Sequence, residues 1–123
     1  MSRLNFKPKQ GAIADFNLEP ILGSETGGKG RPCIVITNDF YNAKLSVIQI
    51  IPITAWSQKK GKIVTNVVLT PSTQNGLTKK SVADCLQTRP VDYTKRLIKP
   101  RGEVNQQTLD KLFRALTILF GLP

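Results

Sequence analysis

The sequence predicts a single domain of mainly β structure, a small antiparallel sheet or barrel with one helix at its C-terminal end. Three observations lead to this prediction. The chain has 123 residues, a length that suits one domain, and we take residues 1–123 as that domain. Its apolar residues gather in short β-branched runs separated by turns rich in Gly, Asn and Pro, a pattern typical of antiparallel sheets. Only in the last segment do the apolar residues recur with the period of an α-helix.

Six segments have the composition of β-strands, because they are rich in Val, Ile and Thr and end at turn residues. We expect strands over residues 11–19, 32–37, 45–54, 62–70, 81–88 and 96–99. A glycine-rich loop at 23–30 joins the first two of them.

The C-terminal segment has the pattern of an amphipathic helix over about 105–120. Apolar residues recur at i, i+3, i+4 and i+7 from Leu109 to Phe120, which places them on one helical face. Asn105 can cap the start of this helix and Gly121 can end it. We expect the apolar face to pack on the sheet.

The charge balance favours a polyanionic partner. The chain has 18 Lys and Arg against 8 Asp and Glu, a formal net charge of +10. Basic residues cluster in several segments of the predicted fold, which favours a patch or groove that binds nucleic acid. No histidine is present, which excludes a Ser-His-Asp triad, histidine-pair ribonuclease chemistry and imidazole metal sites. We expect neither a metal nor a cofactor.

The apolar segments and the N-terminal residues indicate a cytoplasmic protein, in which cysteines are expected to stay reduced. Cys33 and Cys85 are far apart in apolar segments and lack the closely spaced pairs of a zinc site, so we expect two buried thiols, with a disulfide as the alternative. The longest apolar stretches are much shorter than the ~20 residues of a membrane helix. Residues 1–9 are basic and lack the apolar core of a signal peptide, and we expect no membrane partner.

The glycine loop is similar to a phosphate-binding P-loop but departs from it in two ways. Gly23-x4-Gly28-Lys29 has the right spacing, but Gly30 stands where Ser or Thr belongs. A strand follows the loop, whereas a P-loop leads into a helix. We therefore reject nucleotide binding; the loop either covers a groove or is a plain connection.

Polar and basic residues at the ends of the predicted strands are candidates for RNA binding. Arg31 begins a core strand, where a guanidinium can be held rigidly against a phosphate. Thr54 ends an apolar run and precedes an aromatic, amides and lysines, which together supply stacking, hydrogen bonds and charge. Gln87 and Arg89 alternate at the end of another predicted strand and so point to one face.

Together these motifs occur in an order that resembles a known family. Gly23-Ser24-Glu25, Arg31-Pro32, Pro52-Ile53-Thr54 and Gln87-x-Arg89 follow one another along the chain. In this respect the sequence is similar to the MazF/PemK (Kid) toxins, the mRNA-cleaving toxins of bacterial toxin–antitoxin pairs. The resemblance implies an SH3-like, partly open barrel of the CcdB/PemK-like kind, with the C-terminal helix packed on the sheet. It also implies a homodimer, metal-independent cleavage of single-stranded RNA and an acidic cognate antitoxin.

The resemblance further implies roles for individual residues. Arg31 and Thr54 correspond to the family's catalytic arginine and threonine, which would assist attack of the RNA 2′-OH and give 2′,3′-cyclic phosphate and 5′-OH ends. Because arginine titrates above ~12, we assign Arg31 to charge stabilisation and name it as a candidate general acid. The general base is left unassigned, with Asp84 as a candidate. The residues expected to bind RNA are Gln87, Arg89, Trp56, Ser57, Gln58, Lys59, Lys60, Asn17 and Lys29.

Two other functions fit the same composition. A non-catalytic basic β-barrel that binds RNA would explain the charge and the fold, but it would not require Arg31, Thr54 and Gln87 at these places. A gyrase poison of the CcdB type shares the fold expected here. The segment Leu119–Pro123 lacks that family's terminal tryptophan, which disfavours this second alternative.

Overall fold

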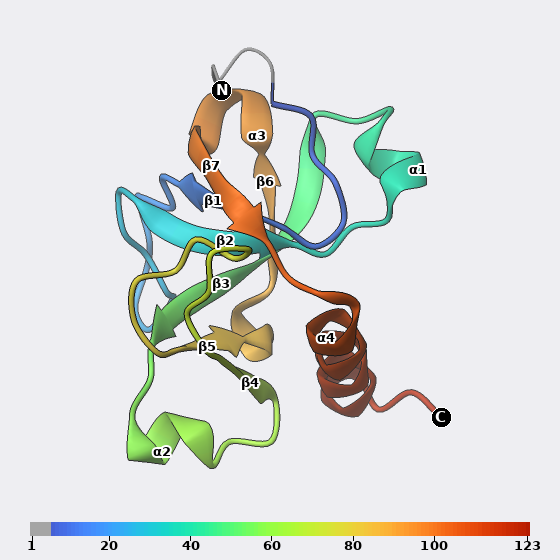
Figure 1. Cartoon of the computed structure of the whole chain (residues 1–123). Helices are drawn as coiled ribbons and strands as arrows, with labels where there is room; N and C mark the ends of the chain where they lie inside the picture. The colour runs from blue at the N-terminus through green and yellow to red at the C-terminus, as the bar shows by residue number, and fades with distance from the viewer. Residues whose placement is uncertain (1–5) are drawn as a thin grey trace.

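A seven-stranded antiparallel sheet curls into an open barrel in the computed structural model, which describes residues 6–123, and one long helix lies beside it (Figure 1). The mainly β class, the open barrel and the C-terminal helix confirm the prediction. Residues 1–5, which the predicted domain and the signal-peptide expectation included, lie outside the described residues.

The third strand along the chain is the central strand of the sheet, because it pairs with three other strands. The strands are β1 (Ala12–Phe16), β2 (Arg31–Val35), β3 (Val47–Ala55), β4 (Asn66–Leu69), β5 (Ser81–Asp84), β6 (Arg89–Asp92) and β7 (Leu97–Glu103). Their order is β4-β5-β3-β2-β1-β7, and β6 pairs with β3 as well. The first half of β3 pairs with β6 and its end pairs with β5, so the sheet bends around this strand. Among the described strands, β4, β6 and β7 each pair with only one other strand, and their unpaired edges leave the barrel open.

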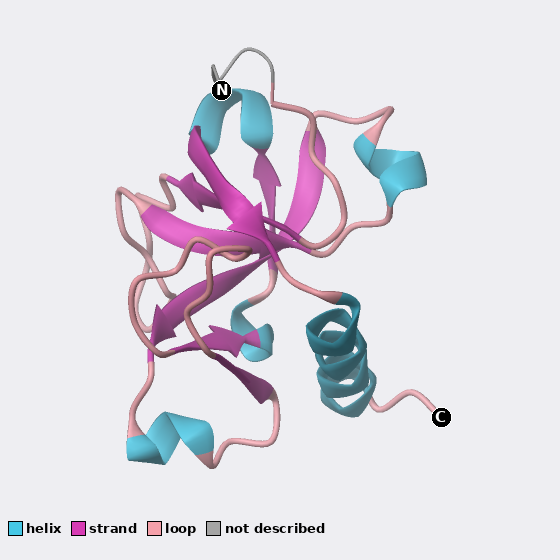
Figure 2. Cartoon of the chain, viewed as in Figure 1, coloured by secondary structure: helices cyan, strands magenta, loops and turns pink. Residues whose placement is uncertain are grey.

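Short helical turns join the strands at the periphery of the sheet (Figure 2). They are α1 (Asp39–Asn42), α2 (Gln58–Gly61), the 3₁₀ turn η2 (Cys85–Gln87) and α3 (Tyr93–Arg96). Asn38, Ser57 and Asp92 cap α1, α2 and α3, each accepting a hydrogen bond from a backbone N–H of the first turn. The sequence analysis did not anticipate these turns, because one helical turn is too short to show a period.

The strand β6 was not predicted, and β1 ends at Phe16 although a strand was expected as far as residue 19. Three further segments also differ from the prediction. The segment 81–88 leaves strand geometry after Asp84, so Gln87 lies in η2 and does not alternate with Arg89 along one strand. The strand expected over 62–70 begins only at Asn66, because the residues that follow α2 form turns. The short strand expected at 96–99 is β7, which continues to Glu103 along β1.

The core lies on both faces of the sheet because successive strand residues alternate between them. One cluster gathers Ile13, Ile34, Ile51 and Ile53 under the long helix, and the other gathers Phe16, Val35, Ile48 and Ile50 on the opposite face, among other residues. The predicted helix is α4 (Gln106–Phe120), capped by Asn105 and followed by Gly121 in the left-handed region. Leu112 and Ala115 bury its inner face, and Leu109 and Leu116 pack partly against the same cluster, which confirms that the helix packs on the sheet. Phe113 and Phe120, which were expected on that face, are exposed instead.

Cys33 and Cys85 are free and buried, as predicted, one in each cluster. Burial is the main cause that raises the pKa of both thiols from about 9, to about 12 for Cys85 and further for Cys33. For Cys85 the neighbouring Asp84 adds to this effect.

Because the pKa values of both thiols are raised in the folded protein, we expect its free energy of unfolding to fall at alkaline pH. The unfolded chain releases the thiol protons above about pH 9 while the folded chain keeps them, so each thiol lowers the free energy of unfolding by ~1.4 kcal/mol per pH unit above that value. Urea denaturation between about pH 8 and pH 11 measures the slope. A Cys33→Ala/Cys85→Ala variant is expected to show a flatter slope, and equal slopes would contradict the prediction.

No helix in residues 6–123 is long and apolar enough to cross a membrane. Within the same residues, no group of three or more His, Cys, Asp or Glu is placed to hold a metal ion.

Candidate active site

The register of β2 and β3 places Arg31 opposite Thr54. Cys33 pairs with Pro52 and Ile34 with Ile51, so the same antiparallel register extended by two residues brings Arg31 and Thr54 across from each other. Directly opposite residues of neighbouring strands share a face, with their Cβ atoms ~5 Å apart. The two predicted catalytic residues therefore meet at the ends of two adjacent strands.

Arg31 and Thr54 both line a cavity of about 430 Å³. Its other lining residues are Gly28, Gly30, Pro32, Ile53, Ala55, Leu77, Thr78, Lys79, Ser81 and Arg101. Two further cations, Lys79 and Arg101, thus join Arg31 around this space. The described lining residues include no carboxylate and no thiol, so the cavity attracts anions.

The Arg31 guanidinium is fixed by main-chain carbonyl groups. Its Nε donates to the carbonyl oxygen of Gly27 at 2.8 Å, and its Nη1 donates to that of Ile53 at 3.4 Å. These bonds use two of the five N–H donors of a guanidinium and leave three for a ligand. Gly28 has φ +125°, and a Cβ there would lie 3.4 Å from Nε and Nη2 of Arg31. A larger residue would strain the loop and press on the guanidinium.

The Thr54 hydroxyl lies next to an ammonium group. Lys60 Nζ is 3.3 Å from Thr54 Oγ1 and 3.3 Å from the carbonyl oxygen of Ala55. Because lysine can only donate, the threonine oxygen accepts and its O–H stays available as a donor. A neighbouring cation polarises that O–H and makes it a stronger donor. Lys60 was expected to bind RNA as part of a loop, and the structure brings it to Thr54.

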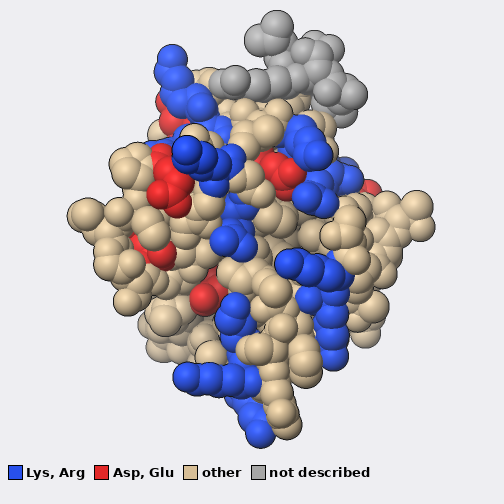
Figure 3. Space-filling model, turned by 90° about the vertical axis from the view of Figure 1, so that its left-hand side faces the viewer, with Lys and Arg blue, Asp and Glu red and all other residues tan. Residues whose placement is uncertain are grey.

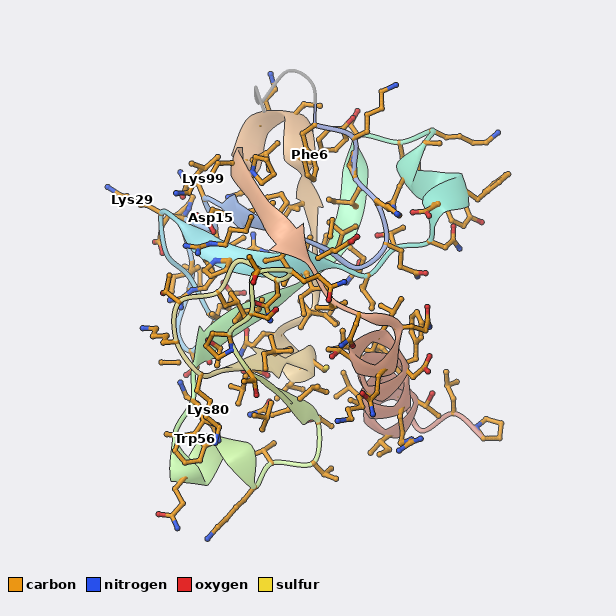
Figure 4. All side chains as sticks on the ribbon, in the orientation of Figure 1. Phe6, Asp15, Lys29, Trp56, Lys80 and Lys99 are labelled. Atoms are coloured by element: carbon orange, nitrogen blue, oxygen red, sulfur yellow. The ribbon has the colours of Figure 1, made fainter. Side chains whose placement is uncertain are left out.

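The rest of the predicted loop forms α2 and the residues before it. Ser57 caps α2, since its Oγ accepts from the Lys60 backbone N–H at 3.1 Å. Trp56 is 38% exposed, and Lys80 Nζ lies 4.1 Å from the centroid of its ring (Figure 4). A Cβ at Gly61 would come within 2.7 Å of Trp56 Nε1, so the glycine allows the indole to lie against α2. Gln58 and Lys59 are exposed.

Gln87 and Arg89 contact the loop between β1 and β2. Gln87 Oε1 accepts from the backbone N–H of Thr26 at 3.1 Å, and its Nε2 donates to the carbonyl of Ser24 at 3.4 Å. Arg89 Nη1 donates to the carbonyl of Leu18 at 3.3 Å. The Gln87 contacts hold the glycine loop on the body of the protein, and the Arg89 contact holds the segment that precedes it.

The remaining predicted RNA-binding residues, Asn17 and Lys29, lie at the two ends of the loop between β1 and β2. Asn17 Oδ1 accepts from the backbone N–H of Glu19 at 3.0 Å, which forms a local turn at the start of this loop. Lys29 is exposed and extends outward from the loop (Figure 4).

Asp84, the candidate general base, does not line the cavity. It lies in a neighbouring depression of about 340 Å³ that it shares with Ser57, Lys59, Lys60 and Asn66, among others. Lys60 lines that depression and also reaches Thr54, so it contacts both the depression that contains Asp84 and the threonine of the cavity.

Basic side chains dominate the side of the molecule on which the glycine loop and α2 lie. Figure 3 shows that Lys and Arg gather on this face, while Asp and Glu are fewer and lie mostly in its upper part. The lower part, where α2 lies, presents basic side chains. This distribution provides the positive surface that the net charge predicts.

Lys79, Ser81 and Arg101 are cavity residues that the sequence analysis missed as site residues. The charge clusters around positions 79 and 101 were a signal, but nothing local in the sequence indicates which cations of a cluster face one cavity. That assignment depends on how β5 and β7 are placed relative to β2 and β3.

Comparison with known proteins finds relatives along nearly the whole chain. A family model described as "PemK-like, MazF-like toxin of type II toxin-antitoxin system" matches residues 9–120. The chain is 32% identical over 119 residues to Endoribonuclease MazF9 of Mycobacterium tuberculosis, covering 93% of this chain and 97% of that protein.

Solved structures with the same fold include toxins alone and in complexes. MazF from Deinococcus radiodurans superposes with a TM-score of 0.79 at 23% identity, covering 96% of this chain and 100% of that chain. A mycobacterial endoribonuclease in complex with its cognate antitoxin gives a TM-score of 0.74 at 21% identity, covering 94% and 97%. The open barrel with its C-terminal helix is therefore a fold that MazF structures share.

Proposed function

The chain belongs to the PemK-like, MazF-like toxins of type II toxin–antitoxin systems, and from this membership we propose that it is an endoribonuclease that cleaves single-stranded RNA without a metal ion. The observation that supports this proposal most directly is the cavity in which Arg31 faces Thr54 among further cations. A site of this kind suits a phosphodiester, which is anionic and offers oxygen acceptors to every donor present.

The proposed reaction uses the nucleophile that RNA itself carries. The 2′-oxygen attacks the adjacent phosphorus, a P–O bond forms, and the bond from phosphorus to the 5′-oxygen breaks. The 2′-OH loses its proton and the departing 5′-oxygen gains one, so the products are a 2′,3′-cyclic phosphate and a 5′-OH. Arg31 would bind the non-bridging oxygens, where negative charge increases in the transition state.

Thr54 would donate its O–H to the same phosphate, while the Lys60 ammonium donates a hydrogen bond to the hydroxyl oxygen. The described cavity residues contribute charge and hydrogen-bond donors rather than a carboxylate base. We therefore assign the cavity the positioning and electrostatic parts of catalysis. Asp84, if it accepts the 2′-OH proton, would do so from the depression next to Lys60.

Cleavage of a long RNA in the presence of EDTA tests the proposed function. We expect discrete cuts, with 5′-OH and 2′,3′-cyclic phosphate ends at a recurring short sequence. A strict requirement for a divalent metal would contradict metal independence. A gel shift without cuts would instead favour the non-catalytic RNA-binding barrel.

We further propose a homodimer and a cognate antitoxin with an acidic segment. The net charge of +10 and the basic face around the cavity would attract a segment rich in Asp and Glu, and such a segment would cover the site by competing with RNA. Co-expression with a small acidic protein encoded beside this one is expected to relieve toxicity. Toxicity that such a neighbour leaves unchanged would contradict this partner.

Lys59 is expected to contribute to RNA binding through charge alone. It is exposed on α2, so Lys59→Ala should weaken binding and reduce the slope of log K against log salt by ~0.7, the value for one phosphate contact on a single strand. Titration of RNA at several salt concentrations measures this slope. Lys111→Ala on the exposed face of α4 is the matched control and should leave the slope unchanged. An unchanged slope in Lys59→Ala would remove Lys59 from the interface.

A further inference from the structure

The cavity contains a second guanidinium whose setting is similar to that of Arg31. Arg101 lies on β7 and lines the cavity beside Arg31 and Lys79. Its Nε donates to Asp15 Oδ1 at 2.6 Å, and its Nη1 donates to the carbonyl oxygen of Gly76 at 3.0 Å. As in Arg31, two of five N–H donors are tied to the protein, and the other three have no partner among the described residues.

Asp15 gives this guanidinium a fixed orientation. The carboxylate is on β1, and its side chain is only 5% exposed, whereas the side chain of Arg101 is 25% exposed. The anion therefore lies inside the protein and the cation reaches from it to the surface of the cavity. Because the ion pair and the Gly76 carbonyl already immobilise the guanidinium, a ligand would bind to it with little further loss of side-chain freedom.

We propose that Arg101 binds a second phosphate of the RNA, adjacent to the one that Arg31 holds, and that Asp15 is its positioning residue. This inference rests on the proposed function and makes it more specific: the cavity would recognise a strand with at least two consecutive phosphates. A single phosphate would engage only Arg31 and its neighbours. Arg101 then contributes to binding of the strand and not to the bond that breaks.

Short uncleavable oligonucleotides test the inference. Oligodeoxynucleotides with one, two and three phosphates lack the 2′-OH, so their affinities measure binding without turnover. In the wild-type protein, the second phosphate is expected to raise affinity by about tenfold, the effect of one additional charge-assisted pair.

The key variant removes the pair without changing the net charge. Asp15→Leu combined with Arg101→Leu replaces the ion pair by two apolar side chains of similar size, a change that buried pairs often tolerate. This variant should bind the one-phosphate ligand like the wild type but lose the tenfold gain from the second phosphate. The same gain in the variant and the wild type would overturn the proposal and leave Arg101 as a structural partner of Asp15.

A second variant keeps the experiment decisive if the double replacement does not fold. Arg101→Lys retains the charge beside Asp15 but loses the planar guanidinium with its paired N–H donors. We expect the gain in affinity from the second phosphate to be at least threefold smaller in this variant than in the wild type. A full gain in Arg101→Lys would again overturn the proposal. Arg114→Leu, an exposed residue of α4, is the control for loss of a cation elsewhere and should keep the full gain.

Kinetics on cleavable RNA separate this inference from the proposed function. Loss of the Asp15–Arg101 pair should raise KM about tenfold and leave kcat within about threefold, because the second phosphate is bound equally in the ground and transition states. An equal fall in kcat would contradict the assignment. Wild-type protein that binds the oligonucleotides with the expected gain but cuts no RNA would overturn the proposed function and leave the two-phosphate site standing.

Discussion

Replacing Arg31 by alanine is expected to lower kcat for RNA cleavage by about 10²–10³-fold, because the transition state loses the guanidinium that faces its developing charge. Arg31→Lys should remain strongly impaired, since an ammonium cannot reproduce two parallel N–H donors. Single-turnover cleavage of the mapped RNA sequence measures both effects.

The control for Arg31 must separate catalysis from folding. Arg31 donates to the carbonyl groups of Gly27 and Ile53, so its removal could loosen the glycine loop. Circular dichroism and thermal unfolding should show that each variant retains the fold, and Arg114→Ala supplies a matched loss of charge on α4. Wild-type cleavage rates in Arg31→Ala would end its assignment as the charge-stabilising residue.

Replacing Thr54 by valine is expected to slow cleavage by about 10²-fold, because valine keeps the shape of threonine but removes the hydroxyl. Thr54→Ser keeps the hydroxyl and should retain activity within about tenfold of the wild type. The ordering of the rates, wild type above serine above valine, is the result to measure at saturating RNA.

Lys60 provides an independent test of the same hydroxyl. Lys60→Met removes the ammonium that lies 3.3 Å from Thr54 Oγ1, and it should lower kcat by about tenfold in the wild-type background. In the Thr54→Val background the same change should have much less effect on kcat, because the hydroxyl that it polarises is already absent. Additive effects in the double variant would show that Lys60 does not act through Thr54.

Much of the fold could be predicted from the sequence because the signals are local. The β-branched runs of β2 and β3 and the helical period of α4 each lie within one short window. Asn105 and Gly121 mark the ends of α4 for the same reason. The bounds near Gln87 were wrong, because the turn η2 follows β5 without a break in composition.

The amino-acid sequence by itself determined most of the strands but not β6, and it determined the long helix, the basic surface and the choice of an arginine and a threonine as candidates for one site. Only the tertiary structure decided which other side chains join them: Lys60 beside Thr54, Gln87 on the glycine loop, and Arg101 in the cavity. Arg101 and Asp15 are 86 positions apart in the chain, and Gln87 and Thr26 are 61 apart. Such contacts depend on how the strands pair and how the sheet curls, and a local sequence pattern predicts neither of these.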